Sequence, residues 1–267
     1  MILASASSLS LTLALSAAAA YAVSALGAVR LGNRAPRVAV RLAWLAHGAM
    51  LLWSLFGSEP RFGFAPALSV TAWLVAAVYA VESRVYPLLQ TRWALSALGA
   101  VAVLLAVMFP GNLLRANASV WLPLHWALGI ASYGLFGVAV VHAWFMTRAE
   151  EQIRLATNPD SGLPLLTMER LTFRFVGAGF LLLSATLLAG LLFDNQLYGS
   201  ATPLKWDHKT AFSFLSWLTF AVLLVGRARF GWRGRRAVRV LYGGAGLLLL
   251  AYVGSRFVLE VILGRSL

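Results

Sequence analysis

Cysteine is absent from the chain, and charged residues make up only 12% of it, against 60% apolar residues. Without cysteine, disulfides, thiolate metal sites, thioether attachment of haem and thiol redox relays are all excluded. A soluble domain of this length carries roughly twice this fraction of charge. The low charge excludes both an ordinary cytosolic globule and a disordered chain, and apolar runs of about 18 residues or more indicate an integral membrane protein.

Negative charge is especially scarce: 9 acidic residues face 22 basic ones, for a formal net charge of +13. Such an excess can indicate nucleic-acid binding. Here, however, 20 of the 22 basic residues are arginines that lie between the apolar runs or at their ends. This distribution is typical of membrane proteins that obey the positive-inside rule. We therefore expect a multi-pass protein of a bacterial inner membrane that binds no nucleic acid.

Eight apolar runs are near the length of roughly 20 residues that a helix needs to cross a bilayer. Helices are expected because an open strand would leave backbone amides unpaired in lipid. The predicted fold is thus an all-α membrane bundle of about eight transmembrane helices. It forms a single membrane domain, 1–267, with one four-helix part at 1–110 and another at 121–263. The expected spans are 8–29, 38–56, 66–83, 92–109, 121–146, 171–193, 209–226 and 238–262.

The connections between these spans differ strongly in charge. The first, third, fifth and seventh connections hold sixteen of the 22 basic residues. The other connections, the last helix and the tail hold six. The positive-inside rule then places the odd connections in the cytoplasm and both termini outside. The segment richest in arginine is Arg227–Arg239, here named the basic turn, which we interpret as a topology anchor. Glu169, with Arg170 and Arg174 beside it, is expected at a solvated helix start.

Motifs of several enzyme classes are missing: the sequence contains no P-loop, no nucleophile elbow and no HExxH. These motifs therefore give no sign of an enzyme, and any site chemistry is left to four histidines. His125 and His208 each begin a helix that enters from outside. His47 and His142 lie six residues from a cytoplasmic-side arginine, or about 9 Å along the helix. The histidines thus form an outer pair and an inner pair.

Bis-histidine ligation of haem iron is one natural use of such a pair in a helix bundle. Lys205, Lys209 and Arg256 lie in the same outer third and could hold propionates by charge-assisted hydrogen bonds. Four aromatic residues surround this level: Trp121, Trp126, Tyr198 and Trp206. Each histidine also has a plainer interpretation, because an intramembrane imidazole can simply join two helices by a hydrogen bond. The residues alone leave the two interpretations open.

From Trp121 onward the chain resembles the cytochrome c assembly family (CcsA/CcmC/HemX-like) of membrane haem proteins, and within it the short HemX/YpjD-type branch. Four segments carry the resemblance: Leu124-His125 with Ser132-Tyr133; Glu169–Arg174 with Gly179-Phe180 and Gly190; Trp206-Asp207-His208-Lys209-Thr210 with Ser216-Trp217-Leu218; and Gly231–Ala237. They cover a little over half of the chain, in the order and topology of the family. The N-terminal half matches mainly through His47-Gly48.

Four departures from the family pattern concern the haem site. The tryptophan-rich loop is degraded, with Tyr198-Gly199 where a Trp-Gly is expected, and His208 stands in the usual place of a proline. Gly226 replaces a histidine, and the second outer histidine after the last helix is missing. The full ligand set of a cytochrome c synthase is therefore absent.

The resemblance implies a protein that handles non-covalent b-type haem in cytochrome c assembly, near the outer leaflet. His125 and His208 would ligate the iron, and Trp206, Asp207, Lys209, Arg256 and Tyr198 would line the site. His47 and His142 could hold a second haem. Partners would be haem, lipid and cytochrome c maturation components. The alternative is an accessory protein that has lost haem transport and regulates a cytoplasmic enzyme of tetrapyrrole metabolism.

Overall fold

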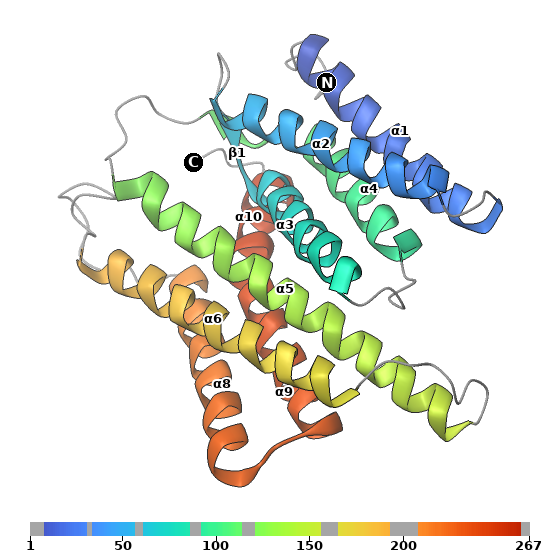
Figure 1. Cartoon of the computed structure of the whole chain (residues 1–267). Helices are drawn as coiled ribbons and strands as arrows, with labels where there is room; N and C mark the ends of the chain where they lie inside the picture. Colours follow the sequence, from blue (N-terminus) through green and yellow to red (C-terminus); the bar gives the residue numbers. More distant parts are fainter. Residues whose placement is uncertain are drawn as a thin grey trace. The chain divides into compact units, whose positions relative to one another are not determined.

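The structure is a computed structural model, which describes residues 8–30, 34–56, 61–85, 92–113, 121–155, 165–192 and 208–262. The chain divides into two compact units (Figure 1). Unit 1 comprises Met1–Ala116 and Arg256–Leu267, and unit 2 comprises Asn117–Ser255.

Helices make up nearly all of the described residues, in agreement with the predicted all-α class. Unit 1 holds α1 (Ser8–Arg30), α2 (Arg34–Phe56), α3 (Phe64–Val85) and α4 (Arg92–Met108). Unit 2 holds α5 (Trp121–Arg154), α6 (Leu165–Leu192), α8 (His208–Phe230), α9 (Gly234–Leu249) and the π-helical turn η2 (Leu250–Gly254). The chain continues through α10 (Ser255–Phe257) and a second π-helical turn, η3 (Val258–Ile262).

Five helical segments of the described chain are long and apolar enough to cross a membrane: Val38–Phe56, Leu124–Arg154, Leu165–Leu192, His208–Phe230 and Gly234–Gly254. Shorter apolar segments occur in the remaining helices, at Leu11–Ala25, Phe64–Val78 and Leu95–Met108. Leucine side chains that are more than half exposed, such as Leu181 and Leu52, suit a lipid environment. The chain is thus a helical membrane protein. Eight crossings and outward termini remain predictions.

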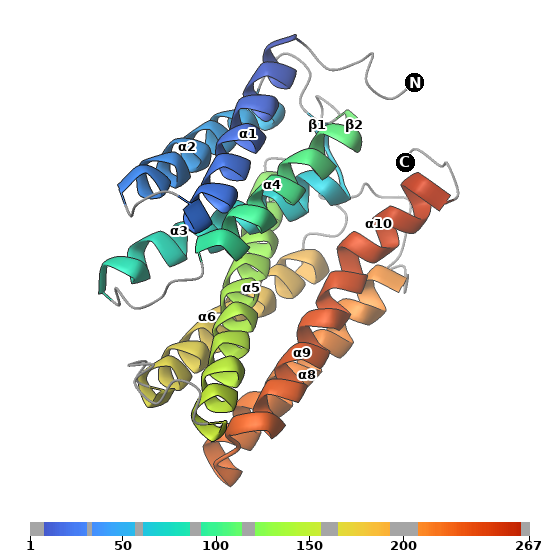
Figure 2. The same cartoon turned by 90° about the vertical axis from the view of Figure 1, so that its right-hand side faces the viewer.

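Unit 1 is a ring of four helices in which α1 packs against α2 and α4, while α3 packs against the same two helices (Figure 2). Its core contains the buried small residues Ala14, Ala17 and Ala43 around the buried ring of Tyr21. A Cβ atom added to Gly99 would lie 2.7 Å from that ring, so only glycine fits there. Small residues thus let the helix backbones approach closely. In lipid the hydrophobic effect does not hold helices together, so this close packing does.

A short β-pair, which the helical prediction did not include, closes one end of unit 1. β1 (Arg61–Phe62) pairs antiparallel with β2 (Asn112–Leu113). Gly111 precedes β2 with a φ of 79°, and a Cβ there would lie 2.4 Å from the carbonyl oxygen of Phe62. The two extended segments lie beyond the helix ends, where backbone groups need partners other than their own helix.

Unit 2 is also a four-helix ring, in which α5 packs on α6, α6 on α8, α8 on α9, and α9 on α5. Phe136 of α5 stacks on Phe220 of α8 across the diagonal, with ring centroids 3.7 Å apart. Glycines on the other two helices make room for this pair, because a Cβ at Gly179 or Gly244 would meet one of its rings within about 3 Å. The core of unit 2 is therefore centred on two stacked phenylalanines.

Candidate functional site

The outer histidines, His125 and His208, lie at the same end of unit 2. Contacts of His125 with Gly190 and of Phe136 with Gly179 show that α5 and α6 are antiparallel. The bond from Trp217 to Ser184 and the bond from Arg227 to Glu169 show that α8 is likewise antiparallel to α6. Consequently α5 and α8 run in the same direction, and both begin at this end.

His125 and His208 lie at nearly the same depth along the bundle of unit 2. His125 precedes Phe136 by eleven residues, and His208 precedes Phe220 by twelve. At 1.5 Å per residue, both histidines lie about 16–18 Å from the stacked pair along the helix axis. The predicted common level of these two histidines thus agrees with the packing of α5 and α8 at their shared end.

His125 has a ring nitrogen without a protein partner. Its Nδ1 atom is buried and has no hydrogen-bond partner among the described residues. The ring packs against Gly190, where an added Cβ would lie 3.5 Å from Cε1, and a ring N–H donates a hydrogen bond to the backbone carbonyl of Thr186. A buried polar atom without a partner is rare in folded proteins and calls for an explanation. A ligand whose metal ion is coordinated by this imidazole nitrogen would supply the missing partner.

Lys209 brings positive charge to the same end. Its ammonium lies 5.8 Å from the centre of the Tyr252 ring and within electrostatic range of the His125 imidazole. His208, the preceding residue, is exposed at the start of α8. Among the described residues it has no hydrogen bond or ring contact. This end of unit 2 therefore carries two imidazoles, which can ligate a metal ion, and one ammonium group, which can pair with an anionic group.

Several predicted site residues cannot be placed at this end. Tyr198, Trp206, Asp207 and Lys205 lie outside the described residues. Arg256 belongs to α10, but its side chain is also outside them. Within the described chain, no group of three or more His, Cys, Asp or Glu side chains is arranged to hold a metal ion. The candidate site accordingly rests on His125, His208 and Lys209.

The inner histidine His47 is buried in unit 1 with both ring nitrogens hydrogen-bonded. Nδ1 lies 3.2 Å from the hydroxyl of Tyr21, and Nε2 lies 2.7 Å from the hydroxyl of Ser69. All three side chains are at most 1% exposed. These bonds join α1, α2 and α3, as expected for an intramembrane histidine with a structural role.

His142, in unit 2, is 3% exposed, and its ring meets that of Phe175 edge-on at 5.4 Å. Both inner histidines are thus enclosed by their own unit. A second haem between them stays a prediction.

Sequence reasoning missed a buried ion pair at the opposite end of unit 2. Glu169 is only 9% exposed, whereas a solvated position was expected for it. The Arg227 guanidinium donates a hydrogen bond to its Oε1 atom, and Nε of Arg233 lies 3.7 Å from the same oxygen. The helix begins at Leu165 rather than near 171, so Glu169 lies inside α6 and faces α8. An acidic residue inside a long apolar helix was the signal that could have identified this pair.

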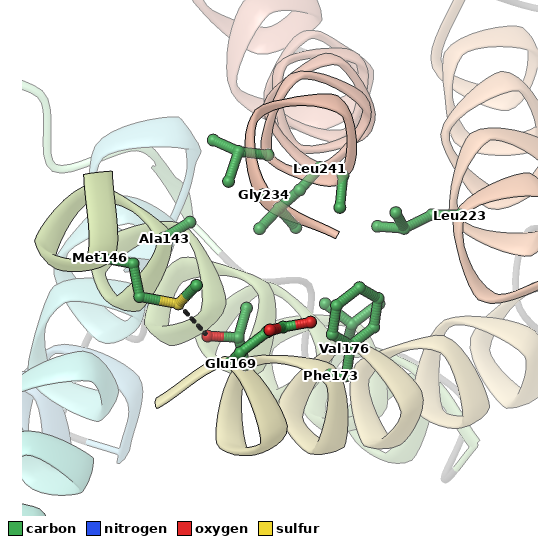
Figure 3. A pocket seen from close by; sticks show the side chains of 11 residues that line it. Ala143, Met146, Glu169, Phe173, Val176, Leu223, Gly234 and Leu241 are labelled. Atoms are coloured by element: carbon green, nitrogen blue, oxygen red, sulfur yellow. Dashed lines mark hydrogen bonds between the residues drawn. The ribbon is translucent and has the colours of Figure 1, made fainter. Parts of the chain in front are cut away.

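A small cavity lies beside the pair (Figure 3). The carboxyl group of Glu169 points into a space between α5, α6, α8 and α9, with Phe173, Val176, Leu223 and Leu241 among its walls. Its volume of about 20 Å³ is sufficient for one water molecule. On the α5 side, the Thr172 hydroxyl lies 3.8 Å from the sulfur of Met146. Nearly all of the lining is apolar, so the cavity offers little to a larger polar ligand.

The basic turn is held against α8 by Trp232. The amide of Trp232 donates to the carbonyl of Gly226 at 3.1 Å, and its own carbonyl accepts a hydrogen bond from Arg227. The indole covers Gly226 so closely that an added Cβ would lie 2.4 Å from the ring. Gly226, noted as a departure from the family pattern, is thus required by the packing of Trp232.

Replacing Gly226 by alanine is expected to destabilise unit 2 by about 1–3 kcal/mol, because the indole must move. Thermal unfolding of the detergent-solubilised protein measures this loss. Gly243 is the matched control, since an added Cβ there meets nothing within 4 Å. An equal effect of the two substitutions would contradict the close fit.

Comparison with known proteins identifies relatives over most of the chain. Residues 36–263 match the family model described as cytochrome C assembly protein. An uncharacterized 28.8 kDa protein of Azospirillum brasilense is 32% identical over 210 residues, covering 74% of this chain and 76% of its own. The cytochrome c biogenesis protein CcsA of Prochlorococcus marinus is 26% identical over 228 residues, with 81% and 69% covered.

The inner membrane protein YpjD of Escherichia coli is 32% identical over 162 residues, covering 59% of this chain and 60% of its own. No solved structure matches the chain. The family match extends over both units and includes all four histidines, so the resemblance is not confined to the C-terminal half. The chain therefore belongs to the cytochrome c assembly protein family.

Proposed function

We propose that this protein binds b-type haem non-covalently at the shared start of α5 and α8 and serves cytochrome c assembly. The observation that carries the proposal is the buried Nδ1 atom of His125, which has no protein partner in the described chain. The name of one relative, cytochrome c biogenesis protein CcsA, supports the role in cytochrome c assembly. Bound haem would supply the redox chemistry of its iron.

In this proposal the residues at the shared helix start have separate roles. His125 is one axial ligand, with the backbone of Thr186 orienting its ring through a hydrogen bond. His208 is the second ligand. Lys209 pairs with a propionate, as does Arg256, and Tyr198, Trp206 and Asp207 cover the porphyrin. The inner histidines keep their structural contacts.

We further propose that the protein spans a bacterial inner membrane eight times with both termini outside. The haem then lies near the outer leaflet, where cytochrome c maturation components can receive it. The distribution of arginines between the connections supports this orientation.

Haem titration of the purified full-length protein in detergent tests the proposal. We expect a Soret band that saturates at one haem per chain, and a reduced spectrum typical of two histidine ligands. A stoichiometry of two would favour a second site at the inner histidines. No saturable Soret band would overturn the proposal. Co-purification of a soluble tetrapyrrole-pathway enzyme with a haem-free protein would instead favour the regulatory alternative.

A further inference from the structure

The basic turn displays guanidinium groups that the protein itself does not neutralise. Its six arginines share one nearby carboxylate, Glu169, which pairs with Arg227 and Arg233. The other four side chains are exposed, and in the described part of the chain no carboxylate forms an ion pair with them: Arg229, Arg235, Arg236 and Arg239. Four positive charges within eleven residues repel one another unless an anion lies between them.

The backbone that carries these arginines is fixed rather than loosely connected. Gly231 and Gly234 adopt φ values of 63° and 56°, which turn the chain sharply between α8 and α9. Trp232 is anchored on Gly226, and the Arg236 guanidinium lies 4.1 Å from the centre of the Trp232 ring. A group of charges on a rigid turn loses little conformational entropy when it binds a ligand. The arrangement is therefore preorganised for an anion.

The surroundings of the turn are those of a membrane surface. It joins His208–Phe230 to Gly234–Gly254, two of the segments that can cross a membrane, and Figure 1 shows them meeting at this tight connection. Phe230, directly beside Arg229, is 74% exposed. An exposed aromatic ring among arginines matches the boundary between acyl chains and headgroups, where such rings are stable.

We propose that the basic turn is a binding site for the phosphate groups of anionic phospholipids, with Arg229, Arg235, Arg236 and Arg239 as its ligating side chains and Phe230 inserted beside the acyl chains. A guanidinium can hold a phosphate with two parallel hydrogen bonds, which an ammonium cannot. The start of α9 adds to the attraction, because the backbone amides at a helix start carry partial positive charge. The first turn of α9 contains no acidic residue that would offset this charge. The site is independent of the proposed haem site.

A lipid fits this surface better than an acidic soluble protein does. The charges lie next to segments that end in the bilayer, so headgroups are present at high local concentration. A cluster of this size next to a membrane segment attracts anionic lipid with about 1 kcal/mol per basic residue. Phe230, moreover, would be buried by acyl chains without any partner protein.

Native mass spectrometry of the full-length protein in detergent tests the proposal with dioctanoyl phosphatidylglycerol as the probe. Dioctanoyl phosphatidylcholine is the neutral control, and inorganic phosphate is a competitor. We expect phosphatidylglycerol to bind at least tenfold more tightly than phosphatidylcholine, with an affinity that falls as salt rises. Inorganic phosphate at equal concentration is expected not to displace it, because it lacks the acyl chains that contact Phe230.

The matched variants each remove four exposed guanidiniums. Changing Arg229, Arg235, Arg236 and Arg239 to glutamine is expected to remove the preference for phosphatidylglycerol. Changing Arg148, Arg154, Arg170 and Arg174 to glutamine, outside the turn, is expected to retain it. If the first variant does not insert, four Arg→Lys changes in the turn keep the charge and should weaken binding several-fold through loss of bidentate contacts.

Three results would overturn the proposal. The first is equal binding of the two lipids by the unaltered protein. The second is an equal loss of the lipid preference in the two glutamine variants, or no loss in either. The third is capture of an acidic protein or of free phosphate by the basic turn without any preference among lipids.

Discussion

Alanine in place of His125 is expected to weaken haem binding by about 100-fold or more, or to abolish it. Residues that merely orient a metal ligand typically change affinity 10–100-fold, so loss of the ligand itself should exceed that range. The substitution also removes the buried Nδ1 atom, which has no protein partner in the described chain. The fold should therefore tolerate the change, while the Soret band is lost. Haem titration together with thermal unfolding separates the two effects.

His142 is the matched control for this experiment. It lies on the same helix, seventeen residues further along, and is buried against Phe175. His142→Ala should lower the stability of unit 2 and leave the affinity for haem at the outer end unchanged. His208→Ala should retain weaker binding with the spectrum of an iron that has a single histidine ligand. Haem affinity that follows His142 rather than His125 would refute the proposed ligand.

The helices could be predicted because long apolar runs in lipid have no other stable backbone conformation. Their ends were less accurate, and the start of α6 shows why. A hydropathy pattern stops at charged residues, whereas the helix continues through good helix formers such as Leu165, Met168 and Glu169. The resulting error placed Glu169 in solvent, although it lies within α6 and is buried.

Contacts between helices were largely beyond prediction from the sequence. Hydrophobic periodicity does not reveal which residues of two separate helices are in contact, so no feature of the sequence predicted the stacking of Phe136 on Phe220. The common level of His125 and His208 was predictable, because it follows from helix direction and rise alone. The partners of His47, by contrast, are hydroxyls on two other helices, and only the packing of unit 1 identifies them.

The ion pair between Glu169 and Arg227 should be the strongest polar interaction in the described part of unit 2. The side chain of Glu169 is 12% exposed and that of Arg227 is 26% exposed, so the carboxylate is the more costly charge to leave alone. We expect Arg227→Gln to destabilise the protein by about 3 kcal/mol, at the lower end of the range for broken buried pairs, because Arg233 remains within reach of Glu169.

Glu169→Gln should cost less than Arg227→Gln, since the two arginines it leaves behind are partly hydrated. The double variant should cost at least about 1 kcal/mol less than the sum of the single ones, because two neutral amides can pair with each other. Denaturant unfolding in mixed micelles measures all three. Arg174→Gln, five residues after Glu169 on α6 and exposed, serves as the control and should change stability by less than about 0.5 kcal/mol. Additive losses would mean that the pair is held by the packing of Phe173 and Trp232 around it rather than by charge.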